Sequence, residues 1–167
     1  MSIAPSWRCV GSRRGYRIVS VIVPAPSSPS EPLPFFVYGT LRPGEPNHDV
    51  FLRGRVREVE PARLNGAVLY EGPGFPYAVE APDGVVRGEL VTARPEAYGG
   101  LLTALDRLEG YVAGDPRNLY ERIAREVVRE ADATVVRAWV YVAGPAVTAR
   151  LRDAGRVIEG GVWSSRR

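Results

Sequence analysis

The chain has 167 residues, of which 45% are hydrophobic and 25% charged, and this size and mixture are typical of one soluble globular domain and exclude collagen-like, coiled-coil and wholly disordered chains. The net charge of +3 comes from the first 34 residues, which contain four arginines and one glutamate. From Phe35 onward, 18 basic residues balance 18 acidic residues. We therefore expect no nucleic-acid partner. With one cysteine, Cys9, and one histidine, His48, neither a disulfide framework nor a Cys/His zinc site can be built, and no nucleophile can be identified for a triad. A metal site made of carboxylates alone stays open.

The first 34 residues have the composition of a linker. They contain six of the 15 prolines and the run Ser27-Ser28-Pro29-Ser30, which predicts a disordered Pro/Ser-rich leader over residues 1–34 and a domain over residues 35–167. The apolar run at residues 18–23 is short and no A-x-A cleavage site follows it, unlike in a signal peptide. Because no stretch approaches the roughly 20 apolar residues that span a bilayer, we expect a cytoplasmic protein without membrane attachment.

Short stretches of strand-forming residues follow one another along the domain. Phe35-Phe36-Val37-Tyr38 predicts a strand that stops at Gly39, and a short helical turn is predicted around residues 48–53. Further strands are predicted over residues 56–60, 64–71, 77–80, 85–91, 120–129 and 135–142. The pair Asp83-Gly84 stands between two of them and is typical of a hairpin turn.

One longer helix is predicted from Pro95 to Glu109, because proline suits the first turn and Gly110 suits the C-terminal cap. Its apolar residues recur at helical spacing and form a stripe that faces inward. The stripe consists of Tyr98, Leu101, Leu102, Leu105 and Leu108. One main α-helix and short helices among many short strands predict an α+β fold built on a small, mostly antiparallel β-barrel.

Glu109 is out of place on this helix. At about 100° per residue it projects within roughly 20° of Tyr98 and Leu102, and so lies on the buried stripe. Two interpretations stay open. In the first, the last turn is frayed and Gly110 lets the carboxylate reach water. In the second, apolar surroundings and the negative end of the helix dipole raise the pKa of Glu109 toward the range useful for general acid-base catalysis.

The segment Tyr38-Gly39-Thr40-Leu41 is a second candidate for the site. Glycine permits backbone dihedral angles that other residues avoid, so that successive N–H groups in this segment can converge on an anion. The alternative is a simple turn that ends the strand. Taken alone, the segment does not decide between a binding loop and a turn, and its combination with other motifs favours the loop.

Several motifs occur together in a specific order. They are Phe36-Val37-Tyr38-Gly39-Thr40-Leu41, Gly44 with Asn47-His48, Leu69-Tyr70, Phe75-Pro76-Tyr77-Ala78-Val79, Gly88-Glu89-Leu90, Leu105-Asp106-Arg107-Leu108-Glu109-Gly110-Tyr111, Tyr120-x-Arg122 and Ala138-Trp139-Val140-Tyr141. In their order and spacing, residues 35–163 resemble the γ-glutamylcyclotransferase-like superfamily, in its branch of γ-glutamylamine cyclotransferases and avirulence-induced-gene proteins. The resemblance implies a catalytic glutamate at Glu109. It also implies a substrate-binding loop formed by Tyr38, Gly39, Thr40 and Leu41, with Tyr120 and Tyr141 similar to tyrosines near the family's pocket.

The resemblance further implies a reaction. The α-amino group of a small-molecule γ-glutamyl amide attacks its own side-chain carbonyl and releases 5-oxoproline with an amine or amino acid. Glu109 takes the proton of the amino group and delivers it to the leaving nitrogen, so neither a metal nor an organic cofactor is expected. The leaving group stays open between an amine, a lysine isopeptide and a masked metabolite, and the loops at residues 72–77 and 114–119 are expected to set this preference. A small-molecule binding or interaction module that keeps the pocket without turnover is the alternative function.

Overall fold

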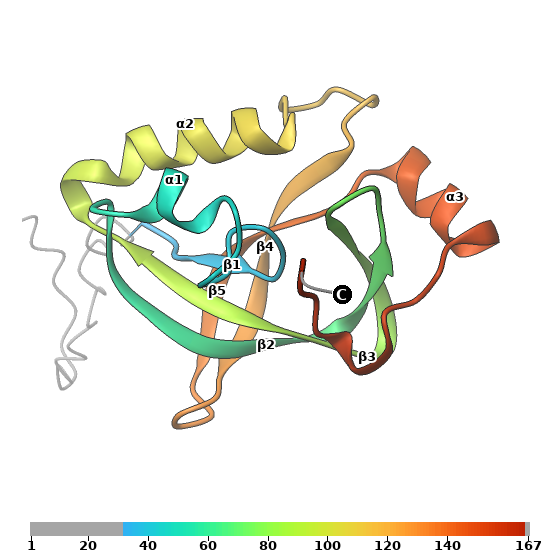
Figure 1. The fold of residues 1–167 in the computed structure, drawn as a ribbon, viewed down its shortest axis with the longest axis horizontal. Helices are drawn as coiled ribbons and strands as arrows, with labels where there is room; N and C mark the ends of the chain where they lie inside the picture. The colour runs from blue at the N-terminus through green and yellow to red at the C-terminus, as the bar shows by residue number, and fades with distance from the viewer. Residues whose placement is uncertain (1–31, 166–167) are drawn as a thin grey trace, which may run out of the picture. The chain divides into compact units, whose positions relative to one another are not determined.

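A closed barrel of five strands forms the body of the described residues, 32–165, in this computed structural model (Figure 1). The strands are β1 (Phe35–Val37), β2 (Val56–Glu71), β3 (Pro76–Ala93), β4 (Tyr120–Arg129) and β5 (Val135–Ala143), and they follow one another around the barrel in the order β1-β3-β2-β4-β5. Neighbouring strands are antiparallel except β1 and β5, which pair in parallel. The predicted α+β fold with a small, mostly antiparallel barrel is confirmed, whereas the predicted leader lies, up to residue 31, outside the described residues.

The β2 and β3 strands are longer than predicted. Each runs through the break expected from the sequence, and the turn that joins them lies at residues 72–75. The prediction of a hairpin turn at Asp83-Gly84 is therefore wrong. The pairing shifts instead from Ala67 opposite Glu80 to Asn65 opposite Val85, so that residues 81–84 form a bulge within β3. Gly84 is required there because a Cβ would lie 2.2 Å from the carbonyl oxygen of Ala67.

The main helix is confirmed with a small change at its start. Pro95 begins a 3₁₀ turn, η1 (Pro95–Ala97), and the α-helix itself is α2 (Tyr98–Glu109). Gly110 ends it in the left-handed conformation, with φ 64°, and the N–H of Tyr111 donates to the carbonyl oxygen of Asp106 at 2.8 Å. Leu101 and Leu105 of the predicted stripe are fully buried, and its other three members are partly buried against the same cluster.

Two shorter helices and a 3₁₀ turn complete the fold. The α1 helix (His48–Leu52) agrees with the predicted helical turn, and it lies beside α2 on one side of the barrel (Figure 1). The α3 helix (Pro145–Ala154) and the 3₁₀ turn η2 (Glu159–Gly161) were not predicted. A signal for α3 was present, because Pro145 stands in the first turn and Val147 and Leu151, four residues apart, form its buried face.

Successive residues from Phe35 to Tyr38, in β1 and directly after it, contribute alternately to two separate cores. Phe35 and Val37 belong to a cluster that includes buried residues of α1, α2 and α3, so this cluster lies between the barrel and its helices. Phe36 and Tyr38 belong to a second cluster, which contains no residue of those three helices and fills the barrel. The period of two along a strand therefore sends successive residues to opposite sides of the barrel wall.

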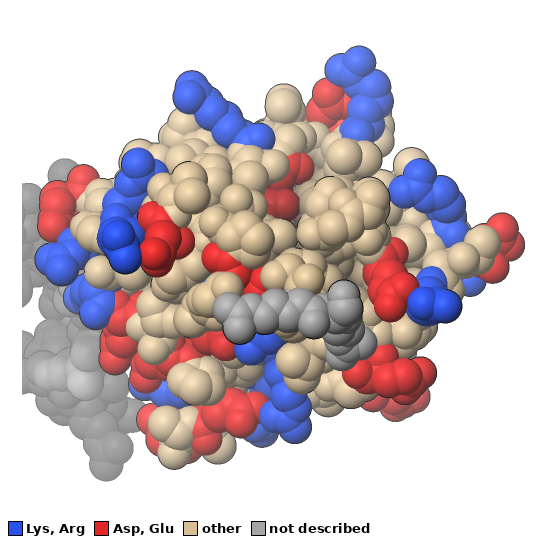
Figure 2. Space-filling model, viewed as in Figure 1, with Lys and Arg blue, Asp and Glu red and all other residues tan. Residues whose placement is uncertain are grey.

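Acidic and basic side chains are interspersed over the face shown in Figure 2, as the balanced charge of the domain indicates. Within residues 32–165, no helix is long and apolar enough to cross a membrane. The cytoplasmic location and the lack of a nucleic-acid partner stay predictions.

Candidate functional site

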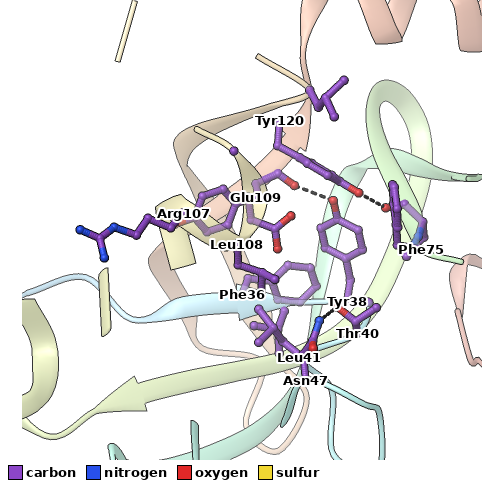
Figure 3. A pocket seen from close by; sticks show the side chains of 16 residues that line it. Phe36, Tyr38, Thr40, Leu41, Asn47, Phe75, Arg107, Leu108, Glu109 and Tyr120 are labelled. Carbon is purple, nitrogen blue, oxygen red and sulfur yellow. Dashed lines mark hydrogen bonds between the residues drawn. The ribbon is translucent and has the colours of Figure 1, made fainter. Parts of the chain in front are cut away.

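A cavity of about 400 Å³ opens where the end of β1, the C-terminal end of α2 and the strands β4 and β5 meet (Figure 3). Every residue that the sequence singled out for the site lines it. These residues are Tyr38, Gly39, Thr40, Leu41, Glu109, Tyr120 and Tyr141. Segments that are far apart in the sequence thus contribute to one cavity, although the role of each residue stays a prediction.

The segment from Tyr38 to Leu41 is held by bonds from the residues that follow it. The Asn47 side-chain amide donates to Thr40 Oγ1 at 3.0 Å, and its backbone N–H donates to the Thr40 carbonyl oxygen at 3.0 Å. Gly39 lies so close to Pro76 that a Cβ would stand 3.0 Å from the proline ring. Within residues 32–165, the backbone N–H groups of Thr40 and Leu41 donate to no other residue, which leaves them available to an anion.

Three tyrosine hydroxyls at the cavity are bound within the protein. The Tyr38 hydroxyl donates to the Tyr141 carbonyl oxygen at 2.6 Å and accepts the N–H of Ala78 at 3.3 Å. The Tyr120 hydroxyl donates to the Pro76 carbonyl oxygen at 2.7 Å, and the Tyr141 hydroxyl donates to an Asp106 carboxylate oxygen at 2.7 Å. Burial is the main cause that raises the pKa of each of the three tyrosines, so their hydroxyls stay protonated at neutral pH.

Glu109 extends from the last turn of α2, and Figure 3 shows its carboxylate pointing into the cavity beside the Tyr38 ring. The side chain makes no hydrogen bond to another residue of the described chain, 32–165, and burial raises its pKa from 4.5 to about 7. The interpretation of a frayed helix end, with the carboxylate in water, does not agree with this position. The carboxylate instead has the pKa of a group that exchanges a proton near neutral pH.

Asp106, one turn earlier on α2, has partners for both carboxylate oxygens. One oxygen accepts the Tyr141 hydroxyl, and the other accepts Arg122 Nη1 at 3.1 Å. The Arg122 guanidinium lies between two aromatic rings, 5.2 Å from the centre of Tyr111 and 4.8 Å from that of Trp139. The sequence gave no sign of this network, because the partners of Asp106 and Arg122 come from β4, β5 and the segment after α2.

Among the described residues that line the cavity, Glu109 is the one acidic side chain. Arg107 is the one basic residue that residues 32–165 contribute to the lining, and its side chain points away from the cavity in Figure 3. Within residues 32–165, no three His, Cys, Asp or Glu side chains lie together as a metal site would require. The described arrangement offers proton transfer by one carboxylate, hydrogen-bond acceptors on the tyrosines and donors on a backbone loop.

Several residues of the lining were not singled out individually from the sequence. Asn47 occurs in one of the motifs quoted for the resemblance, but its bond to Thr40 depends on how the chain turns back after β1. Phe75, Pro76 and Leu119 line the cavity from the two loops that were expected to contact the leaving group. Leu119 is 51% exposed, so an apolar side chain stands at the mouth of the cavity.

Comparison with known proteins identifies the family to which this chain belongs. The family model described as gamma-glutamyl cyclotransferase, AIG2-like, matches residues 35–165. A gamma-L-glutamyl-butirosin B gamma-glutamyl cyclotransferase from Niallia circulans is 35% identical over 108 residues, which are 64% of this chain and 64% of that protein. The match thus spans less than two thirds of the relative's length. The resemblance inferred from the sequence motifs is confirmed at the level of the family.

Solved structures support the same fold. The crystal structure of an aig2-like protein from Mus musculus is 23% identical, with a TM-score of 0.59, over 81% of this chain and 90% of that chain. The solution structure of a protein from Arabidopsis thaliana is 31% identical, with a TM-score of 0.51, over 70% of this chain and 66% of that chain. The barrel with its helices is therefore similar to structures from an animal and a plant.

Proposed function

Because the chain belongs to the gamma-glutamyl cyclotransferase, AIG2-like family, we propose that it converts a γ-glutamyl amide to 5-oxoproline and a free amine or amino acid, with Glu109 as general base and acid. The observation that carries the proposal is the position of Glu109. Its carboxylate enters the cavity without a hydrogen-bond partner among residues 32–165, and its pKa is raised to about 7. Such a carboxylate is able both to accept a proton and to return it near neutral pH.

The reaction needs one proton carrier. Glu109 takes a proton from the α-ammonium group, and the neutral amine attacks the γ-carbonyl carbon of the same molecule. A new C–N bond forms, and the proton held by Glu109 moves to the leaving nitrogen as the bond between that nitrogen and the carbonyl carbon breaks. The ionised Glu109 then takes the second proton of the ring nitrogen, which gives the neutral lactam of 5-oxoproline, and passes it to the released amine. Because nucleophile and electrophile belong to one molecule, holding its folded conformer supplies much of the rate, and no covalent intermediate with the protein is required.

The tyrosines support this assignment by exclusion. Each of the three cavity tyrosines donates its hydroxyl proton to a protein oxygen, and the pKa of each is raised. They are therefore poor proton carriers at neutral pH. Glu109 is the side chain of the cavity that is suited to both proton transfers.

The loop at the end of β1 suits the negative charges of the reaction. The N–H groups of Thr40 and Leu41 are held in place by the bonds between Thr40 and Asn47. We assign to them the binding of the substrate's carboxylate or of the oxygen that becomes negative during attack. Preorganised donors of this kind are worth roughly 3 kcal/mol each in the transition state.

The test measures 5-oxoproline by mass spectrometry after the purified protein meets a panel of γ-glutamyl amines, γ-glutamyl amino acids and γ-glutamyl-lysine isopeptides. Wild type should release 5-oxoproline from at least one member. Glu109→Gln should keep the fold, because the two side chains are nearly isosteric, and should lose about 1,000-fold or more in kcat. Glu96→Gln is the matched control, since Glu96 is exposed and lies outside the cavity.

Two results would count against the proposal. Turnover by Glu109→Gln at the wild-type rate would remove Glu109 from the chemistry. No release from any member, together with thermal stabilisation of the protein by 5-oxoproline, would favour the alternative of a binding module without turnover.

A further inference from the structure

The hydroxyl protons of the cavity tyrosines all point to atoms of the protein. Tyr38 donates to the Tyr141 carbonyl oxygen, Tyr120 to the Pro76 carbonyl oxygen and Tyr141 to Asp106. A hydroxyl has one proton and two acceptor lone pairs. Any hydrogen bond that these oxygens make to a molecule in the cavity is therefore one that they accept.

The cavity consequently has two chemically different ends. Figure 3 shows Glu109 and Tyr120 toward one end, and Thr40 and Asn47 toward the other. The first end offers a carboxylate and phenol oxygens, which accept hydrogen bonds. The second is lined by Thr40 and Leu41, whose backbone N–H groups are donors that no residue of 32–165 accepts. An ammonium group fits the first end, because it has N–H donors and no acceptor, and a carboxylate fits the second.

We propose, on the premise of the proposed function, that Asp106 is a positioning residue that fixes the Tyr141 hydroxyl as a hydrogen-bond acceptor for the α-ammonium group of the substrate. Asp106 does not line the cavity and acts through Tyr141. By accepting the only hydroxyl proton, its carboxylate keeps a Tyr141 lone pair free for an N–H of the substrate. Once Glu109 has removed one proton, an N–H held by Tyr141 helps to direct the nitrogen lone pair toward the γ-carbonyl.

The partners of Asp106 explain why its carboxylate holds this orientation. Its second oxygen accepts Arg122 Nη1 at 3.1 Å, and Arg122 is itself fixed between Tyr111 and Trp139. The exposed fractions of the Asp106 and Arg122 side chains are 24% and 17%, so water competes only partly for the pair. The carboxylate is thus held from one side, and its other oxygen stays directed at Tyr141.

The conservative variant Asp106→Asn separates this role from simple packing. The asparagine oxygen pairs best with Arg122, which has only donors, and the NH₂ group then faces Tyr141. The Tyr141 hydroxyl must accept this N–H, and its own proton turns away from residue 106 toward the cavity. The Tyr141 hydroxyl proton, now directed into the cavity, repels the N–H groups of the substrate's ammonium group.

The experiment compares two ligands that differ only in the amino group. The first is γ-glutamyl-methylamide, and the second is its des-amino analogue, N-methylglutaramic acid, used as a competitive inhibitor. Asp106→Asn should raise the KM for the first about tenfold and change the inhibition constant of the second less than twofold. Tyr141→Phe should behave in the same way, and the double variant should be no worse than either single variant.

A matched control breaks a similar ion pair elsewhere. Glu60 pairs with Arg129 at 3.2 Å, their side chains are 20% and 28% exposed, and neither residue lines the cavity. Glu60→Gln should leave both ligands unaffected. If Asp106→Asn weakens the binding of the two ligands equally, or of neither, the positioning role is overturned. A general loss of packing would affect the two ligands alike, since they differ only in having an ammonium group or a hydrogen atom on the α-carbon.

Failure of the proposed function gives a different result. In that case wild type releases no 5-oxoproline from any γ-glutamyl amide, and calorimetry can measure the binding of both ligands directly. Tighter binding of the amino-bearing ligand by wild type, lost in Asp106→Asn, would still support the positioning role. Equal binding of the two ligands by wild type would overturn it.

Discussion

The last turns of α2 place two carboxylates in regions of the molecule that differ in the hydrogen-bond donors they provide. On the side of β4 and β5, Asp106 has a partner for each oxygen, and Arg122 balances its charge. On the side of the cavity, Glu109 has no hydrogen-bond partner among residues 32–165, and its pKa is raised to about 7. Only two residues lie between a carboxylate with a partner for each oxygen and a carboxylate with a raised pKa and no partner.

This difference shows how a helix can hold both kinds of group. Residues three apart lie on adjacent parts of a helix surface, yet they can face different elements. Asp106 accepts hydrogen bonds from a guanidinium and a hydroxyl group. In contrast, the Glu109 carboxylate lies beside the Tyr38 ring and has no donor among residues 32–165. Burial, with no donor to stabilise the charge, raises the pKa of the Glu109 carboxylate.

After the loss of activity expected for Glu109→Gln, the largest expected effect is on the pH dependence of activity. If Glu109 must be ionised to accept the substrate's proton, kcat/KM should rise with pH up to about 7, the pKa of this carboxylate, and level off above it. At pH 5, two units lower, kcat/KM should be about 100-fold below the plateau. Steady-state kinetics across pH 4.5–8 measures this limb, and a limb near pH 4.5 would show that Glu109 behaves as a solvated carboxylate.

A smaller effect is expected on stability when the paired carboxylate is removed. Asp106→Asn leaves the Arg122 guanidinium without its counter-charge, and we expect the free energy of unfolding at pH 8 to fall by about 2 kcal/mol. Urea denaturation of the variant beside wild type measures the change. An unchanged midpoint would mean that the two rings alone are enough to hold Arg122.

The smallest effect has the opposite sign and depends on pH. The pKa of Glu109 is about 7 in the folded chain, against 4.5 ordinarily, so wild type loses stability relative to Glu109→Gln as pH rises through this interval. After allowance for partial exposure, Glu109→Gln should be more stable by about 1.5 kcal/mol at pH 8 and almost equal to wild type at pH 4. Thermal melts at the two pH values provide the measurement. A variant that is less stable at pH 8 would contradict an unpaired, buried Glu109.

Much of the fold follows from local patterns in the sequence. The main helix could be predicted because Pro95 and Gly110 mark its ends and a stripe of apolar residues recurs at helical spacing. The long course of β2 and β3 could not be predicted in this way. Asp83-Gly84 has the composition of a hairpin turn, but Gly84 serves the close approach of β3 to the backbone of Ala67, and such a contact between distant residues leaves no local pattern.

The residues of the candidate site likewise differ in how far they could be predicted from sequence. Glu109 could be found from sequence, because a carboxylate on an apolar stripe contradicts the pattern around it. The network of Asp106 could not, since its hydrogen-bond partners, Arg122 and Tyr141, reach it only after the barrel closes. Residues that are unusual for their own element can be recognised from sequence, whereas residues that act through tertiary partners need coordinates.

The short strand β1 has a consequence for the order of folding. The β2–β3 and β4–β5 pairs join strands that follow each other in the chain, so their loops close at a low cost in entropy. In contrast, Phe35 of β1 lies opposite Val91 and Trp139, far along the chain, and pairings of this kind form late. Tyr38 follows β1 directly and bonds to Tyr141. We therefore expect the Tyr38–Leu41 segment to become ordered in the step that closes the barrel, so that only a completely folded chain has the complete cavity.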